Sequence, residues 1–296
     1  MINKINDKIN LYGDNIAKVE QYDFSRANSS DEARTLAITS IATICTQKFD
    51  SIGSESLCTK LLTEAHGIPS SAYGFVPVLL NAKQMRKIAS IVNKETFIKH
   101  DFELNITKFG EMIRDGESLL TNLRALVNDI GLEASKEFYN TDENEIATIK
   151  KHFKVFKHKM DIRSARQFMR HSTAVWQELS RRYVSGKKVP FEFYLKENLK
   201  ENYSYYTEQN QTISLYSEEI IDICANHYYK LIEEGVKPQD ARDVLPLCTY
   251  TEIWSGWQPF ALENMLKERT AIGTQWELRQ TAIAMQELIK EEEKIC

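Results

Sequence analysis

Charged and hydrogen-bonding side chains are most concentrated between Ala165 and Tyr183, and this segment is the first candidate for chemistry. Its polar members are Arg166, Gln167, Arg170, His171, Glu178, Ser180, Arg181 and Arg182. On a helix, Arg163, Gln167 and Arg170 would share one face, because residues three and four apart are neighbours there. The guanidinium fork of arginine suits phosphate. The spacing therefore predicts a site for a small, multiply charged anion, with a solvated basic helix face as the alternative.

Composition narrows the class of protein. A chain of 296 residues can bury a substantial core in one large domain or two small ones. A net charge of −4 argues against a nucleic-acid partner held by bulk electrostatics. Five widely spaced cysteines without a CxxC pair disfavour a disulfide framework and a zinc site, so no metal is expected. Without an apolar leader or a membrane-length apolar run, the expectation is a soluble cytoplasmic protein with no membrane partner.

Hydrophobic periodicity predicts the elements that must position this segment. Residues 1–30 are polar and are expected to form an N-terminal arm or strand, followed by a single domain over residues 31–296 with an insert at about 81–150. Before the segment, the predicted elements are helices from Asp31 to Ile44 and from Ser54 to Gly67, a strand from Tyr73 to Leu80, a helix after residue 81, a strand from Asp101 to Lys108, an amphipathic helix over 122–128, an acidic linker at 140–145 and a strand from His152 to Met160. After it, helices begin at Ser217 and Pro238. The sequence shows no P-loop, HExxH, GxGxxG or Ser-His-Asp arrangement. A hydrolase or an enzyme that uses nucleoside triphosphates therefore has no support from its motifs.

The order of polar residues in the segment resembles the signature of flavin-dependent thymidylate synthases, R-H-R-x-x-S-x-N-E-x-S-x-R-Y. The matching positions are Arg170, His171, Glu178, Ser180, Arg182 and Tyr183. The departures are Ser172 in place of the second Arg, Val175 in place of Ser and Gln177 in place of Asn.

Other segments extend the resemblance in the same order along the chain. Ala241-Arg-Asp-Val-Leu-Pro246 is similar to the family's A-R-x-V-L-P, and Gln275-Trp-Glu-Leu-Arg279 falls in register beyond it. Asn264 and Arg269 also fall in register, whereas Gln258 and Phe260 replace the Asn and Arg of N-x-R. His66 resembles the histidine that precedes a strand in the family, and 122–128 resembles the flavin-contacting pattern N-x-R-x-L-x-N, with an ordinary amphipathic helix as the alternative.

The resemblance implies an α+β fold with a twisted antiparallel sheet, flanking helices and a homotetramer. It also implies methylation of dUMP to dTMP with methylenetetrahydrofolate as carbon donor and FAD reduced by NADPH, without a cysteine nucleophile. The residues carried over to the pyrimidine nucleotide are Gln167, Arg170, Glu178, Ser180, Arg182, Arg242 and Arg269, of which Ser180, Glu178 and Arg269 are the catalytic candidates. Those expected at FAD or folate are His66, His171, Asn264, Asn122 and Arg124.

Two arginines of the family's flavin side are replaced here, by Ser172 and Phe260. Because charge-assisted contacts contribute about 1.5–3 kcal/mol each, flavin affinity should fall unless another segment compensates. We expect Arg124, with Asn122 and Asn128, to replace the missing arginine. Two other functions stay open: methylation or hydroxymethylation of another pyrimidine nucleotide such as dCMP, and nucleotide binding without catalysis.

Overall fold

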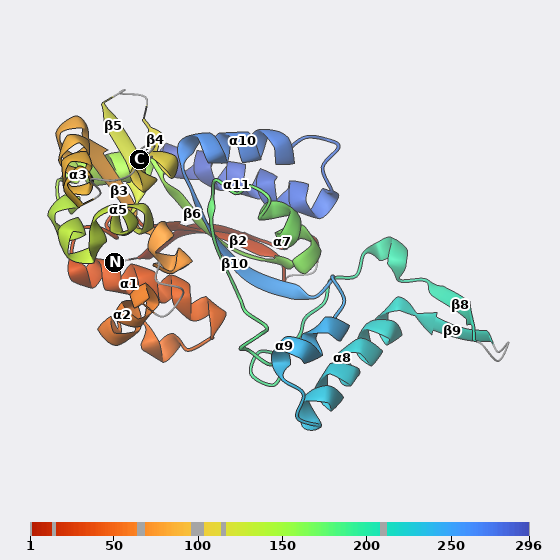
Figure 1. Cartoon of the computed structure of the whole chain (residues 1–296). Helices are drawn as coiled ribbons and strands as arrows, with labels where there is room; N and C mark the ends of the chain where they lie inside the picture. Colours follow the sequence, from red (N-terminus) through yellow and green to blue (C-terminus); the bar gives the residue numbers. More distant parts are fainter. Residues whose placement is uncertain are drawn as a thin grey trace.

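The computed structural model describes residues 2–13, 16–63, 69–95, 104–113, 117–207 and 212–295. Its centre is a five-stranded sheet with the strand order β1-β2-β6-β10-β7, in which every neighbouring pair is antiparallel (Figure 1). The strands are β1 (Asn3–Ile9), β2 (Lys18–Asp23), β6 (Lys154–Asp161), β7 (Val175–Glu178) and β10 (Tyr250–Trp257). Helices lie on both faces of this sheet (Figure 1). The prediction of an α+β fold with an antiparallel sheet is confirmed.

The middle strand β6 follows the predicted alternation of lysine with apolar residues. Val155, His158 and Met160 are buried, while Lys157 and Lys159 are half-exposed. Such a strand must be covered on its apolar positions, and β2 and β10 pair with its two edges. β6 therefore carries the chain through the centre of the sheet directly into the polar segment.

The first residues of the chain belong to this sheet rather than to a separate arm. β2 pairs with β6 through Val19↔His158, and β1 pairs with β2 at the sheet edge. Gln21 is fully buried, and its Nε2 donates to Glu292 at 2.6 Å. Burial requires such a partner for an amide, so the start and the end of the chain are fastened together.

Two hydrophobic cores cover the two faces of the sheet. On one face lie α7 (Ile162–Phe168), α10 (Pro259–Arg269) and α11 (Trp276–Ile295). α11 buries Leu278, Ala282 and Met285 at three- and four-residue spacing. On the other face lie α1 (Asp31–Ala42), the 3-10 turn η3 (Ser71–Phe75) and the insert (Figure 1).

The two helices before the insert begin close to their predicted positions. α1 was expected to have Asp31 as its N-cap, but the cap is Ser30, whose side chain accepts from the backbone N–H of Ala33 at 3.1 Å. Asp31 lies instead in the first turn, where the helix dipole favours a carboxylate. α2 spans Glu55–Thr63, and the predicted end near Gly67 lies outside the described residues.

The insert forms a second sheet with the order β3-β5-β4 and four helices around it. Its elements are β3 (Pro77–Asn81), α3 (Ala82–Glu95), α4 (Asn105–Lys108), β4 (Glu111–Met112), β5 (Ser118–Asn122), α5 (Leu123–Ser135) and α6 (Glu143–His152). Pro77 opens the edge strand β3, as its position there allows.

Two predictions in the insert are wrong, and a long-range contact explains one of them. The strand expected at 101–108 is the helix α4 over its described part, because the Asp129 carboxylate accepts from the backbone N–H groups of Asn105 and Ile106 at 3.0 and 2.9 Å. The amphipathic helix expected over 122–128 is confirmed by α5, which has Asn122 as its N-cap, while residues 119–122 belong to β5, which is buried between β3 and β4. The acidic stretch at 140–145 is no linker, because Asp142 caps α6.

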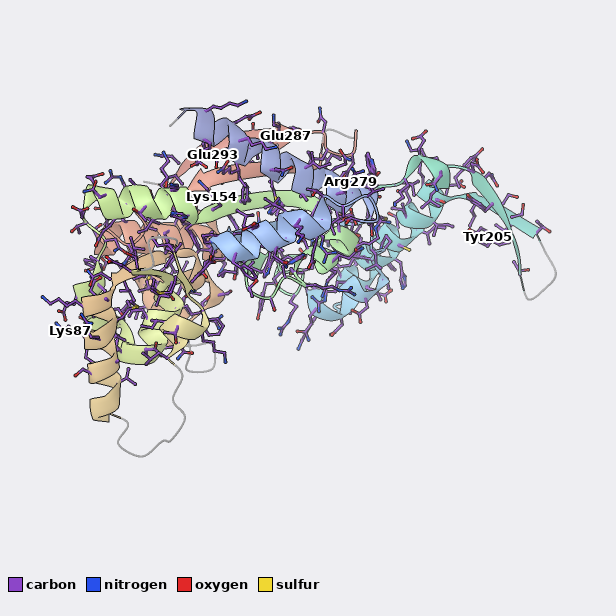
Figure 2. All side chains as sticks on the ribbon, turned by 90° about the horizontal axis from the view of Figure 1, so that it is seen from above. Lys87, Lys154, Tyr205, Arg279, Glu287 and Glu293 are labelled. Carbon is purple, nitrogen blue, oxygen red and sulfur yellow. The ribbon has the colours of Figure 1, made fainter. Side chains whose placement is uncertain are left out.

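The chain beyond the polar segment forms an extension to one side of the molecule. Its elements are the hairpin β8 (Asn202–Tyr206) and β9 (Thr212–Tyr216), then α8 (Ser217–Glu233) and α9 (Pro238–Ala241). Figure 2 shows the hairpin with Tyr205 reaching away from the body. α8 begins at Ser217 as predicted. Among the described residues, no helix is both long and apolar enough to cross a membrane.

Candidate functional site

The polar segment folds as a short helix, a turn and an edge strand. α7 starts after Asp161, whose carboxylate accepts from the Ser164 backbone N–H at 3.0 Å and from its Oγ at 2.8 Å. The helix ends at Phe168, a fully buried ring, and residues 169–174 form the turn that leads into β7. Arg170 therefore lies beyond the helix, and the prediction that Arg163, Gln167 and Arg170 share one helix face is wrong.

Arg163 has a structural role and does not belong to the predicted anion-binding cluster. Its guanidinium lies 3.2 Å from Asp161 and 3.4 Å from Glu277, two carboxylates that are fully buried. Arg181 is also buried: it donates to the Val189 carbonyl at 2.7 Å, and its guanidinium lies 4.7 Å from the centre of the Phe191 ring. Both cations are committed within the protein.

His171 and Arg269 meet at the centre of the candidate site. Arg269, the last residue of α10, donates through Nε to His171 Nε2 at 2.8 Å. The imidazole is buried, and the Trp176 indole donates to the His171 carbonyl at 3.1 Å. Burial and the charge of Arg269 lower the pKa of His171. A neutral ring that accepts at Nε2 carries its proton on Nδ1.

Glu178 ends β7 beside two further arginines. Its carboxylate accepts from Thr251 Oγ1 at 3.0 Å, across the β7–β10 pairing. Burial raises the pKa of Glu178, and the charges of Arg166 and Arg242 act in the opposite direction. Arg242 is exposed on the 3-10 turn after α9, where its Nε donates to the Gln239 carbonyl at 3.1 Å. A carboxylate with two nearby cations can orient hydrogen bonds to a polar ring while the cations face an anion.

The remaining nucleotide candidates are Gln167, Ser180, Arg170 and Arg182. Gln167 Nε2 donates to Gln275 Oε1, next to Glu277 at the start of α11. Ser180 lies in the turn after β7, and its carbonyl accepts from the Val184 backbone N–H at 3.0 Å. Arg170 and Arg182 are exposed.

A cavity of about 460 Å³ lies between the turn of the polar segment and the insert. Its lining includes Asn105, Phe109, Asn122, Arg124, Asn128, Ser172, Thr173, Trp176 and Gln258. The insert thus brings Arg124 and Asn128 to the same cavity as Ser172 and Gln258, two of the positions that depart from the signature motifs. Aromatic walls, amides and one guanidinium suit a planar ring that has a polar edge and a negatively charged or carbonyl group.

Arg124 and Asn122 reach this cavity with part of their hydrogen-bonding capacity already used. Arg124 Nε donates to the Pro69 carbonyl at 2.9 Å. Asn122 is buried, and its Oδ1 accepts from the Ala125 backbone N–H at 3.0 Å as the N-cap of α5. The structure therefore makes Asn122 chiefly a helix cap, while Arg124 and the exposed Asn128 are the better candidates for a ligand.

Gln177 takes part in a network that the sequence did not reveal. Its Oε1 accepts from Ser71 Oγ, and its Nε2 lies 2.7 Å from Cys45 Sγ. The Cys45 thiol donates to the Glu178 carbonyl at 3.1 Å. Burial raises the pKa of Cys45 to about 11, so the thiol stays protonated at neutral pH. No local pattern predicts this network, because its members come from three separate segments.

The remaining cofactor candidates are Asn264 and His66. Asn264 is exposed on α10, and its amide donates to Glu268 at 3.3 Å. His66 lies outside the described residues. Within the described ranges, no group of three or more His, Cys, Asp or Glu side chains could hold a metal ion.

Comparison with known proteins agrees with the motif order. A family model described as thymidylate synthase complementing protein matches residues 146–293, half of the chain. The flavin-dependent thymidylate synthase of Thermus thermophilus is 37% identical over 134 residues, which cover 43% of this chain and 48% of that protein. The enzyme so named from Pseudothermotoga lettingae is 37% identical over 129 residues, 43% of this chain and 56% of the relative. That from Aquifex aeolicus is 31% identical over 137 residues, 42% of this chain and 41% of the relative.

The match places the polar segment in a family and leaves the insert outside it. The chain spans about half the length of the curated relatives it matches. The matched residues include α7, β7, β10, α10 and most of α11, whereas Arg124 and Asn128 lie before them. The chain therefore belongs to the thymidylate synthase complementing protein family, whose curated relatives are named flavin-dependent thymidylate synthases.

Proposed function

We propose that this protein methylates a pyrimidine deoxynucleoside monophosphate, converting dUMP to dTMP with methylenetetrahydrofolate as carbon donor and FAD reduced by NADPH. The observation that carries the proposal is the hydrogen bond between Arg269 and His171, while Glu178, on the strand that follows the His171 turn, feels the charges of Arg166 and Arg242. These residues come from the ends of β7 and α10 and from the turn after α9. Their convergence supports a site for a ring with polar edges that bears a phosphate.

On the nucleotide side, the exposed arginines are the phosphate ligands. Arg170, Arg182 and Arg242 are free to meet an anion at the surface, and their planar forks suit phosphate oxygens. Gln167 and Ser180 supply hydrogen bonds to the sugar and the base. These groups bind and orient the substrate, which is a large part of the catalytic contribution that a protein makes in cofactor enzymes.

Arg269 and Glu178 act on the pyrimidine itself. The His171 ring accepts from the Arg269 guanidinium at Nε, and Nη2 lies 3.9 Å from the Glu268 carboxylate, which leaves Nη1 to offset negative charge that develops on a pyrimidine carbonyl. Glu178, held by Thr251, accepts a hydrogen bond from the ring or its sugar. Ser180 lies two residues beyond Glu178 and completes the catalytic set.

On the cofactor side, bound FAD would supply the hydride that reduces the transferred carbon to a methyl group. The cavity beside Ser172 has the chemical character for a ring of this kind, since it combines Trp176 and Phe109 with amides and Arg124. Arg124 and Asn128 would contact the ring or its neighbouring groups, with Asn122 fixing the start of their helix. His171 would contact the cofactor from the turn, and His66 and Asn264 complete the cofactor or folate side.

The exposed position of the phosphate ligands supports an assembly of several chains. Arg170, Arg182 and Arg242 line none of the described cavities. Since reactions of this kind need water to be excluded, another surface must close over the nucleotide. A homotetramer would provide it.

The departures at Ser172, Gln258 and Phe260 favour a second candidate, a relative that binds nucleotide without catalysis. The amide nitrogen of Gln258 donates to two carbonyls of the insert, those of Phe109 and Leu120, at 2.7 and 3.2 Å. A third candidate, modification of dCMP, keeps the same chemistry on another base. Turnover assays with dUMP and dCMP separate it from the first.

The visible spectrum of the protein tests the first proposal against the second. The protein is incubated with FAD, desalted and scanned before and after dUMP is added. A retained flavin band that shifts with dUMP is the expected result. A colourless protein that binds dUMP would contradict the enzymatic proposal and leave nucleotide binding as the function.

A further inference from the structure

The insert is fastened to the start of α10 by two side chains. Glu111 of β4 accepts the Phe260 backbone N–H, at 2.8 and 3.1 Å from its two carboxylate oxygens. Gln258 donates to the Phe109 and Leu120 carbonyls. We name these contacts of Glu111 and Gln258 the insert latch. A carboxylate at the first turn of a helix is favoured by the unpaired N–H groups and the dipole there.

The insert latch lies between two neighbouring cavities. Besides the cavity of about 460 Å³, a second one of about 340 Å³ is lined by Lys108, Glu111 and Phe260. The two cavities share Phe109, Ser172, Thr173 and Gln258. A ligand in the cavity of about 460 Å³ would therefore contact Phe109 and Gln258, which the insert latch holds in place.

We infer that the insert forms one wall of a pteridine-ring site in the same chain, and that Glu111 is a positioning residue for it. Flavins and folates share this fused ring, whose amide-like edge can pair with asparagine and glutamine side chains. Phe109 and Trp176 would lie against the ring, Asn128 and Gln258 would meet its edge, and Arg124 would meet a carbonyl or an anionic group. This inference rests on the proposed function for the choice of ring but not for the site.

Substitution of Glu111 tests this inference. Glu111→Ala removes the acceptor of the Phe260 N–H, whereas Glu111→Gln keeps an acceptor oxygen and loses the charge. Glu133→Ala is the matched control, because Glu133 is 82% exposed and pairs with Lys136 at 3.1 Å. Binding of FAD, folic acid and dUMP is measured separately by calorimetry for each variant.

We expect Glu111→Ala to lower the affinity for FAD or folic acid by roughly 10-fold, within the usual range for coupled sites. Glu111→Gln should restore most of that affinity, and Glu133→Ala should match the unmodified chain. A lower affinity for FAD in Glu111→Ala identifies the ring as a flavin, and a lower affinity for folic acid identifies it as a folate. dUMP affinity should not change.

Two results would overturn the inference. One is unchanged affinity for both ring compounds in Glu111→Ala, and the other is failure of the unmodified chain to bind either compound while it binds dUMP. Ring binding that depends on Glu111 in a protein without affinity for dUMP would instead contradict the proposed function and leave the ring site standing.

Discussion

Replacing Arg124 by alanine tests the cofactor side most directly. If the Arg124 guanidinium contacts a carbonyl or phosphate group of bound FAD, its loss removes a charge-assisted hydrogen bond of about 1.5–3 kcal/mol. That free energy corresponds to a roughly 10- to 150-fold weaker FAD affinity. Arg124 also donates to the Pro69 carbonyl at 2.9 Å, so the free energy of unfolding should fall by about 1 kcal/mol in parallel. Equilibrium dialysis with FAD measures the first effect and urea unfolding the second.

Two comparisons separate a lost ligand contact from general damage. Arg124→Lys keeps the charge but loses the planar fork, so its FAD affinity should lie between those of the alanine variant and the unmodified chain. dUMP affinity should stay within about twofold in both variants, because none of the nucleotide candidates lines the cavity that Arg124 reaches. Unchanged FAD affinity in Arg124→Ala would refute the assignment, and so would parallel losses of FAD and dUMP affinity.

Three further predictions address the nucleotide, the core and the pH dependence. Arg242→Ala should weaken dUMP binding at least about 10-fold and leave FAD binding unchanged in calorimetry, because it removes a phosphate contact on the nucleotide side, and the bond to the Gln239 carbonyl that is also lost lies at the surface. Phe168→Ala should lower the free energy of unfolding by about 3–5 kcal/mol in urea titrations, since this fully buried ring supports the turn. Burial lowers the pKa of His158 from its ordinary 6.5 to about 3, so the unfolded chain binds the extra proton between these values. The free energy of unfolding should therefore fall by about 1.4 kcal/mol per pH unit as the pH drops through that window, and His158→Gln should flatten this slope.

The sequence predicted elements well where their pattern is local. The alternation around Lys157 and Lys159 predicted β6 because the side chains of these two lysines face outward. Glu252, for example, lies 2.9 Å from Lys157. The strand expected at 101–108 failed because a carboxylate from α5, Asp129, caps α4 from more than twenty residues away. No window of neighbouring residues contains that contact.

Prediction of the site divided in the same way. The signature and the segments that follow it predicted His171, Glu178 and Arg269 as site residues, and all three lie within the residues that the family model matches. The sequence did not separate Arg163, which is half-buried against two buried carboxylates, and Arg181, which is buried against the Val189 carbonyl, from the exposed Arg170 and Arg182. A guanidinium that pairs with a buried carboxylate and one that faces solvent carry the same letter in the sequence, and only the tertiary fold distinguishes them.

The departures from the family's motifs and the insert are best explained together. Ser172 and Gln258 would each suggest a lost cofactor contact if they were considered alone. In the structure both line the cavity that Arg124 and Asn128 enter from the insert, and Gln258 holds the insert there. Two of the family's arginines are replaced here, by Ser172 and Phe260, and Arg124 would restore one positive charge to the cavity. Loss of signature residues in this chain is therefore weak evidence for loss of function, and the variants of Arg124 and Glu111 measure how much of the cofactor side the insert provides.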